Sequence, residues 1–286
     1  MSSSDPNRVD GGLTPLWILL TVVWFAPMFG LATIFFGTLA IIASLFDGHG
    51  GLQHRIAQIW AKTLMALAWS PTEIVGPGIR YLHLHAKTPN LRANEPNPHA
   101  KTPIFASNHL SYSDTPVLFS HLPFQFRIVA RSGLWKVPFI GWYLHRSGQI
   151  PVDSTSLRSS LASMNGGAKA LQAGTPLVIF PEGGRSEDGH LKPFMNGPAY
   201  MAVKAGVPIV PLALIGTREL LPMHAKYLRP GRLRLAVGEP IDTEGFTTRN
   251  LDPLTEKLYS AIEDLQREFG QPEKKPVSSE RMQHVE

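Results

Sequence analysis

The sequence predicts an α/β fold, a mixed sheet flanked by helices, preceded by a helical segment embedded in a membrane. After residue 70, short apolar runs bounded by turn residues alternate with helix-like stretches, which is typical of strands and helices in a sheet covered on its faces. Before that point, no charged residue occurs from residue 11 to residue 46. One transmembrane helix needs only ~20 apolar residues, so this run is long enough to enter a membrane.

The uncharged run of residues 11–46 is too long for one straight crossing. As a single helix it would measure ~54 Å, against a hydrocarbon core of ~30 Å. Pro27 and Gly30 lie near its middle, where a break costs least. The run therefore fits either one kinked span or a tight helical hairpin that enters one leaflet. A cleaved signal peptide fits poorly, because the run is too long and residues 1–10 lack a positive cluster.

Apolar residues at helical spacing follow between residues 52 and 67. They fit an amphipathic helix in the headgroup region, with Trp60 and Trp69 as interfacial anchors. They fit equally an ordinary helix packed on the domain. The predicted regions are a membrane anchor over 1–69, a second domain over 70–270 and a flexible, polar tail over 271–286.

The elements of the second domain follow from its apolar runs. Strands are expected at 103–106, 127–130, 177–180, 207–214 and 232–237, and helices at 156–172, 198–205 and 252–269. Gly174, Gly206 and Gly270 each follow a helical pattern and suit a helix C-cap. Two prolines in residues 207–211 favour an edge strand or a bulge over a central strand.

The stretch around His83 and His85 gives a weaker signal. The two imidazoles would share one face of a strand, and without a third ligand nearby they fit half-buried side chains better than a metal site. Residues 84–101 are rich in Pro, Asn and His and are predicted to form a loop.

Charge is scarce and unevenly distributed. Charged residues make up 17% of the chain, and 27 Lys and Arg exceed 22 Asp and Glu to give a net charge of +5. The charges of residues 1–69 sum to zero, so the whole excess lies on residues 70–286. This excess fits an anionic partner such as membrane phosphate, an acidic substrate or nucleic acid. The absence of Cys excludes disulfides, thiolate metal sites and cysteine nucleophiles.

A His and an Asp follow the predicted strand 103–106, in the order His109-x4-Asp114. The Asp can simply cap the helix that begins near Thr115, with the His filling a loop. Alternatively, the pair forms a dyad in which Asp114 holds one imidazole nitrogen and the other takes a proton from a hydroxyl. The context favours the dyad, because catalytic groups commonly project where a strand leads through a tight loop into a helix.

Paired glycines and an arginine follow the strand 177–180, in the segment Glu182-Gly183-Gly184-Arg185-Ser186. The glycines let backbone amides approach a ligand, and the guanidinium matches phosphate, although a plain turn with a solvated Arg fits as well. Residues 131–153 alternate basic and aromatic side chains, which fits a lip that faces membrane or substrate. No recognised nucleic-acid module surrounds that segment, so we predict no nucleic-acid partner.

Taken together, in this order and spacing, these segments resemble the glycerolipid acyltransferase family, and most closely its bacterial 1-acyl-sn-glycerol-3-phosphate acyltransferases. Asn108-His109-x4-Asp114 matches the family's N-H-x4-D block, residues 180–186 match F-P-E-G-T-R-S, and residues 207–211 match V-P-I-V-P. The resemblance covers roughly residues 74–241 and extends to the N-terminal membrane helices. It implies a glycerol-3-phosphate acyltransferase-like α/β fold.

The sequence departs from the family pattern at four positions. Gly184 replaces the usual Thr, while Ser154 stands where the family often has Arg. Arg131 and Met195 stand where it often has Lys, and only Arg131 keeps the charge. These departures bear on the polar head group of the substrate more than on the reaction.

The resemblance also implies a mechanism. His109 would be the general base on the free sn-2 hydroxyl of lysophosphatidic acid, supported by Asp114, and the product would be phosphatidic acid. The acyl donor would be a thioester of coenzyme A or acyl-carrier protein, without a covalent acyl-enzyme. The acceptor phosphate would be held by the segment Glu182, Gly183, Gly184, Arg185 and Ser186, with Arg131 as a further substrate-binding residue. No metal or other cofactor is implied.

The implied partners are a phospholipid membrane, a lysophospholipid and the thioester donor. Because the positive charges follow the apolar segment, we expect a cytoplasmic (inner) membrane protein whose catalytic domain faces the cytoplasm. Three alternatives stay open: an acyltransferase for another lysolipid, an acyl thioesterase in which His109 activates water, and a lipid-binding protein without turnover.

Overall fold

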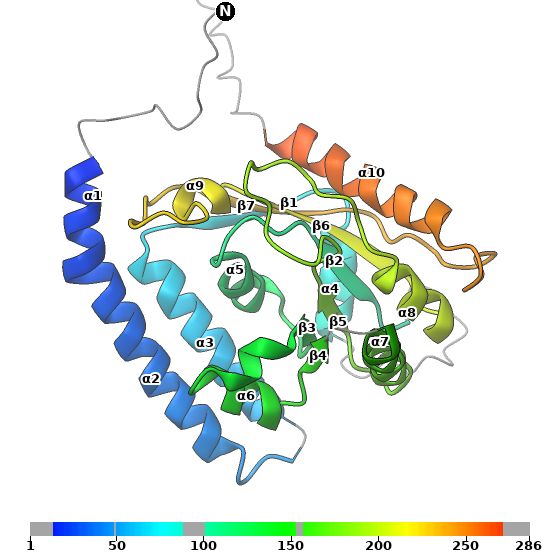
Figure 1. Cartoon of the computed structure of the whole chain (residues 1–286), viewed down its shortest axis with the longest axis horizontal. Coiled ribbons are helices and arrows are strands. Elements are labelled where there is room, and N and C mark those ends of the chain that lie inside the picture. The colour runs from blue at the N-terminus through cyan, green and yellow to red at the C-terminus, as the bar shows by residue number, and fades with distance from the viewer. Residues whose placement is uncertain (1–13, 49, 88–100, 153–156, 271–286) are drawn as a thin grey trace, which may run out of the picture.

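A mixed seven-stranded sheet lies at the centre of the molecule, with helices on both faces (Figure 1). The computed structural model describes residues 14–48, 50–87, 101–152 and 157–270. The strands are β1 (Thr72–Val75), β2 (Ile104–Ser107), β3 (Arg127–Arg131), β4 (Ile150–Val152), β5 (Leu177–Ile179), β6 (Ile209–Ile215) and β7 (Leu233–Val237). Their order is β1-β7-β6-β2-β5-β3-β4, parallel throughout except for the antiparallel pair β6 and β7.

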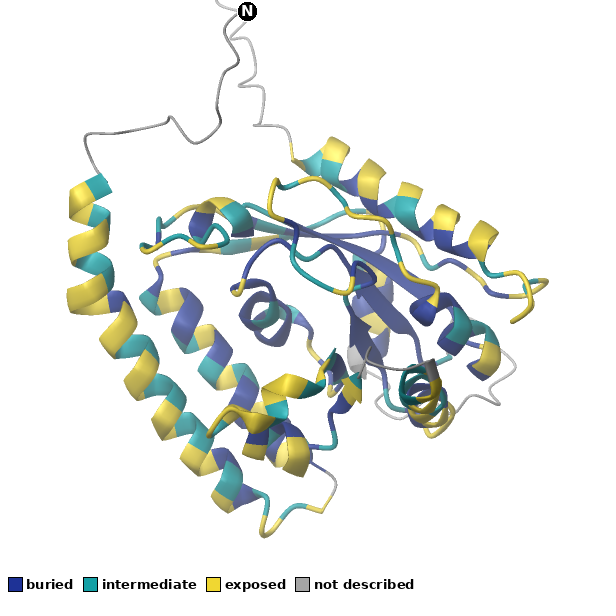
Figure 2. Cartoon of the chain, viewed as in Figure 1, coloured by how far each residue is buried: buried dark blue, intermediate teal, exposed yellow. Residues whose placement is uncertain are grey.

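Side chains alternate between two hydrophobic cores because successive residues of a strand point to opposite faces. In β2, Ile104 and Ala106 join the core under α7, α8 and α10, whereas Phe105 joins the core under α3, α4 and α5. Figure 2 shows the strands buried between the two layers. The helices of the sheet domain are α3 (Gly51–Leu67), α4 (Ile79–Lys87), α5 (Asp114–His121), η4 (Ser132–Lys136, 3-10), α6 (Ile140–Arg146), α7 (Leu157–Gln172), α8 (Gly197–Ala205), α9 (Thr217–Leu220) and α10 (Asp252–Phe269).

Residues 14–43 of the apolar N-terminal run form one continuous helix. It comprises α1 (Thr14–Leu20), the π-helical turn η2 (Thr21–Phe25) and α2 (Ala26–Ala43), and by length and composition it could cross a membrane. The wide turn ends two residues before Pro27, whose ring cannot fit the regular helical ladder. The π-helical turn therefore lies close to where the sequence predicts a break. The turn widens the helix there, and the chain continues in the same direction.

Helix α3 packs on the sheet domain. Ala57, Ala61 and Leu64 lie in the same core as the sheet residues. The indole of Trp60 donates to Oγ1 of Thr33 in α2 (3.1 Å), so this side chain ties two helices together. The predicted boundary between residues 69 and 70 thus separates a helix from the sheet on which it packs.

The histidine stretch is helical, and the strand prediction for it is wrong. His83 and His85 lie on α4, where residues two apart point to different faces, so His83 is exposed and His85 buried. The ring of His85 packs against Tyr81, one helical turn earlier. The predicted loop at 84–101 therefore starts inside α4, and residues 88–100 lie outside the described residues.

Strand β6, which carries Pro211, is central and not an edge strand. It lies between β7 and β2. The proline is tolerated because the pairing is irregular there: Leu212 pairs with Val237 but Ile209 with Ile241, so the partner chain carries one extra residue. The predicted bulge thus exists, on the chain that faces Pro211, and the missing amide costs no regular ladder bond.

Acid is expected to destabilise the fold through two buried histidines. Burial lowers the pKa of His54 and of His85 to about 4, from an ordinary 6.5. The unfolded chain takes up these protons first, so the stability is fully present above pH 6.5 and is lost as the pH falls towards 4. Urea unfolding of the detergent-solubilised protein at pH 7.5 and at pH 5 measures this effect. The free energy of unfolding should fall less between the two pH values in His54→Leu than in the wild type. Phe126→Leu, a nearby core change without a titrating group, should show the same fall in the free energy of unfolding between pH 7.5 and pH 5 as the wild type.

Candidate active site

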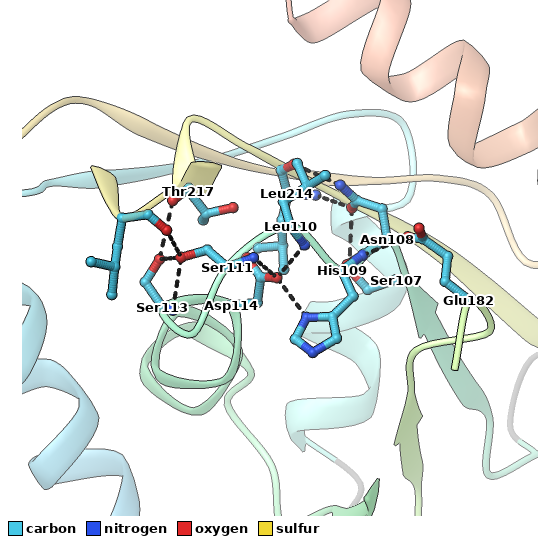
Figure 3. Close-up of polar contacts among 11 residues, drawn as sticks. Ser107, Asn108, His109, Leu110, Ser111, Ser113, Asp114, Glu182, Leu214 and Thr217 are labelled. Atoms are coloured by element: carbon cyan, nitrogen blue, oxygen red, sulfur yellow. Dashed lines mark hydrogen bonds and ion pairs between the residues drawn. The ribbon is translucent and has the colours of Figure 1, made fainter. Parts of the chain in front are cut away.

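The predicted catalytic pair and the predicted substrate-binding segment follow two adjacent strands at their carboxyl ends, where ligands bind in open α/β sheets. His109 lies two residues after β2, and residues 180–186 follow β5, which pairs with β2. Figure 3 shows the two loops meeting, with Asp114 and Glu182 approaching the His109 residue from different sides.

His109 and Asp114 form a hydrogen-bonded pair. Nδ1 of His109 lies 2.7 Å from Oδ2 of Asp114, whose side chain is fully buried. The same oxygen accepts the backbone amides of Leu110 (2.6 Å) and Ser111 (2.8 Å). A proton on Nδ1, donated to this carboxylate, leaves Nε2 as the basic nitrogen. The imidazole is also stacked on Phe180, with ring centroids 4.0 Å apart, so its plane is fixed.

Asn108 secures the loop to the sheet. Its amide Nδ2 donates to the Leu214 carbonyl (3.0 Å), and its Oδ1 accepts the Leu214 amide (2.7 Å). A side chain thus extends the hydrogen bonding between β2 and β6 by one residue. Nearby, Ser111 donates to the Leu221 carbonyl (2.9 Å) and accepts from the Ser113 hydroxyl (2.9 Å). These contacts hold the loop that carries the dyad in one geometry.

Glu182 links the two loops. Its Oε1 accepts the backbone amide of His109 (2.7 Å), and its Oε2 accepts that of Lys192 (3.1 Å). Burial raises the pKa of Glu182, and the two amide donors oppose that rise. In return, the Ser186 amide donates to the His109 carbonyl (2.8 Å). Both carboxylate oxygens of Glu182 are thus engaged in holding the two loops together.

The glycine-rich segment leaves two consecutive amides free. The Gly183 amide closes a turn on the Phe180 carbonyl (3.1 Å), and Gly183 has a positive φ of 67°. Within the described part of the chain, the amides of Gly184 and Arg185 have no acceptor. Adjacent free amides beside a guanidinium are donors suited to an anion. The hydroxyl of Ser186 donates to Asp188 (2.9 Å) within a turn.

A cavity of about 820 Å³ opens at the dyad. His109, Gly183, Gly184 and Arg185 line it, together with the exposed Arg131 at the end of β3. Apolar side chains form most of the remaining wall, and they come from α2, α3, α5, α6 and α8. The site therefore combines a base, cations and a large apolar volume.

Three of the four departures from the family pattern line this cavity, namely Gly184, Arg131 and Met195. Met195 lines the cavity, and its Sδ lies 2.7 Å from where a Cβ at position 183 would stand, so it covers Gly183. Ser154 lies outside the described residues. No group of three or more His, Cys, Asp and Glu side chains that could hold a metal ion occurs within the described ranges.

Sequence reasoning left two residues of the site without a role. Asn108 and Phe180 stand inside the quoted blocks, each beside a residue to which a function was assigned. The only signal for these two residues was their position in the chain. A polar side chain at the end of a strand can continue the hydrogen bonding of the sheet, and an aromatic side chain beside a catalytic segment can stack on an imidazole. Neither contact follows from spacing.

Comparisons with known proteins agree with this geometry. A family model described as acyltransferase matches residues 89–215. The chain is 30% identical over 246 residues to a 1-acyl-sn-glycerol-3-phosphate acyltransferase of Chlamydomonas reinhardtii, which covers 84% of this chain and 68% of that protein. It is 29% identical over 226 residues to the chloroplastic 1-acyl-sn-glycerol-3-phosphate acyltransferase LPAT1 of Arabidopsis thaliana, covering 77% of this chain and 58% of the plant protein's length.

A solved structure has the same fold. The crystal structure of the 1-acyl-sn-glycerophosphate (LPA) acyltransferase PlsC from Thermotoga maritima matches with a TM-score of 0.71 at 21% identity, covering 91% of this chain and all of that one. The predicted fold class is thereby confirmed. The family model and the Chlamydomonas relative together define an acyltransferase. More particularly, the chain belongs to the family of the 1-acyl-sn-glycerol-3-phosphate acyltransferases.

Proposed function

We propose that this protein transfers a fatty acyl group from an acyl thioester to the sn-2 hydroxyl of lysophosphatidic acid, giving phosphatidic acid. The observation that supports this most is the His109–Asp114 pair at a large apolar cavity that also contains Arg185. A lysophospholipid has the matching parts, namely a hydroxyl, an acyl chain and a phosphate.

The reaction needs one base and no covalent intermediate. Nε2 of His109 takes the hydroxyl proton while that oxygen attacks the thioester carbonyl. Asp114 holds Nδ1–H and stabilises the imidazolium that forms. When the carbon–sulfur bond breaks, the imidazolium returns the proton to the departing thiolate. The protein supplies orientation and electrostatics, and we propose no metal or other cofactor.

The acceptor phosphate is proposed to bind at the glycine-rich segment. The free amides of Gly184 and Arg185 and the Arg185 guanidinium supply donors there. Lys192 adds a charge, because its ammonium lies 3.7 Å from where a Cβ at position 184 would stand. This lysine compensates in part for the one that the family pattern has at Met195. Arg131 approaches the same cavity from β3.

The membrane is proposed to meet the apolar face of the helix formed by α1, η2 and α2. Large exposed side chains on that face include Leu19, Val22 and Phe35, and Figure 2 shows exposed residues along the outer side of both helices. Trp142 of α6 is exposed as well, next to α2. Lipid would cover surface that is costly to leave in water. We propose, as the charge distribution predicts, that the sheet domain faces the cytoplasm.

The test is an assay of the purified full-length protein with acyl-CoA or acyl-carrier protein thioester and a panel of lysolipid acceptors, with mass-spectrometric detection of products. Phosphatidic acid formation in preference to other products supports the proposal. Turnover restricted to another lysolipid would move the function to that acceptor. Fatty acid released at one rate with and without acceptor would indicate a thioesterase, and no turnover with either donor would indicate a binding protein.

Arg185→Ala is expected to raise the acceptor KM about 10- to 100-fold, because a charge-assisted contact to phosphate is worth about 1.5–3 kcal/mol. The KM of the donor should change little. Initial rates over a range of lysophosphatidate concentrations measure both. Arg249→Ala, a change at an exposed arginine that does not line the described cavity, is the matched control. An unchanged acceptor KM and kcat in Arg185→Ala would contradict the phosphate-binding role.

A further inference from the structure

The guanidinium of Arg185 is stacked on the ring of Tyr112. Its Cζ atom lies 3.5 Å from the ring centroid. Tyr112 belongs to the loop between β2 and α5, whereas Arg185 belongs to the loop after β5, and both side chains line the cavity with His109. The contact therefore joins the segment that carries the base to the one that carries the cation.

Among the described residues, this stack is the contact that orients the guanidinium of Arg185. Nη1 of Arg185 is buried without a hydrogen-bond partner, and no ion pair or hydrogen bond of the guanidinium occurs in the described part of the chain. An arginine without such contacts loses much rotamer freedom when it binds a ligand. A ring that fixes the guanidinium plane beforehand removes part of that cost.

Tyr112 contributes little to the hydrophobic core. Its side chain is 68% exposed, which is unusual for an aromatic residue inside a loop whose other polar atoms are tightly bonded. Its neighbours in that loop behave differently, since Ser111 is fully buried and Ser113 nearly so. A purely structural role would place the ring inward. The exposed position over a cation fits a role at the cavity.

The geometry points to Tyr112 as a positioning residue that presents Arg185 to the acceptor phosphate. This inference rests on the proposed function, in which Arg185 binds that phosphate. It assigns Tyr112 an effect on acceptor binding, exerted through Arg185, and none on the donor or on proton transfer. The face of the ring is required, and the phenolic hydroxyl is not, because the attraction comes from the ring's π electrons.

The kinetic test uses the full-length protein with acyl-CoA and lysophosphatidate. Tyr112→Ala and Tyr112→Leu should raise the acceptor KM about 3- to 30-fold, with kcat within about twofold and the donor KM unchanged. Tyr112→Phe should retain wild-type kinetics. Tyr112→Ala combined with Arg185→Ala should be no worse than Arg185→Ala alone. Tyr200→Ala removes the tyrosine of a remote pair with Lys204 and should leave the acceptor KM unchanged.

Additive losses in the double variant, an unchanged acceptor KM in Tyr112→Ala, or equal damage from Tyr112→Phe would each overturn the inference. A second readout does not depend on turnover. Phenylglyoxal should label Arg185 faster in Tyr112→Ala than in the wild type or Tyr112→Phe, as measured by peptide mass spectrometry. Equal labelling rates would also overturn it. A wild-type protein that fails to acylate lysophosphatidate would instead contradict the proposed function, whatever the labelling shows.

Discussion

His109→Ala is expected to lower kcat about 10²- to 10⁴-fold, the usual contribution of a positioned general base. The fold should survive, because the contacts of His109 with Glu182 and Ser186 use backbone atoms that alanine retains. Melting temperature and flotation with lipid vesicles should therefore match the wild type. Product formation measured by mass spectrometry gives the rate.

His190→Ala is the matched control, since His190 is exposed and does not line the described cavity. It should leave kcat unchanged. Retention of more than a tenth of wild-type kcat in His109→Ala, with the fold intact, would mean that another group takes the hydroxyl proton.

Asp114→Asn separates the charge of the aspartate from its geometry. The single oxygen Oδ2 accepts all three hydrogen bonds from His109, Leu110 and Ser111, while Oδ1 is buried without a partner. An asparagine carbonyl can take the Oδ2 position and keep these bonds, with its amide where Oδ1 stood. What is lost is the negative charge that stabilises the imidazolium. We expect kcat to fall about 10²- to 10³-fold with little change in either KM.

Asp114→Ala is the companion variant, because it removes geometry and charge together and leaves buried donors unsatisfied. It should lose activity at least as fully and also unfold at a lower temperature, since each orphaned donor costs about 1–3 kcal/mol. If Asp114→Asn kept wild-type kcat, the aspartate would act only by orienting His109.

The strongest sequence patterns predicted the fold well. Helix α10 has the predicted bounds, because its apolar stripe is regular and Pro253 marks its first turn. The short strands β1 and β4 were missed, since three or four residues give too little periodicity. Alternation around His83 resembled a strand, but tertiary packing of Tyr81 and His85 selected a helix there.

The sequence predicts which residues form the candidate site better than it predicts the hydrogen bonds between them. The sequence order placed His109 and Asp114 in one loop, and the structure puts them in hydrogen-bonding contact. The partners of Glu182 could not be predicted, because the residues that it joins are 73 and 10 positions away along the chain. Contacts of that kind depend on how strands pair, which residue types alone do not specify.

The contact between the N-terminal helix and the sheet domain has a practical consequence. Phe29, Phe36 and Ala40 of α2 form part of the cavity wall, and Thr21 of η2 accepts the Leu228 amide (2.9 Å). Removing the apolar helix to obtain a more soluble protein would therefore take away one wall of the cavity. Water would then reach the interior around Leu64 and Met65. The N-terminal helix is a component of the enzyme's interior as well as of the proposed lipid contact.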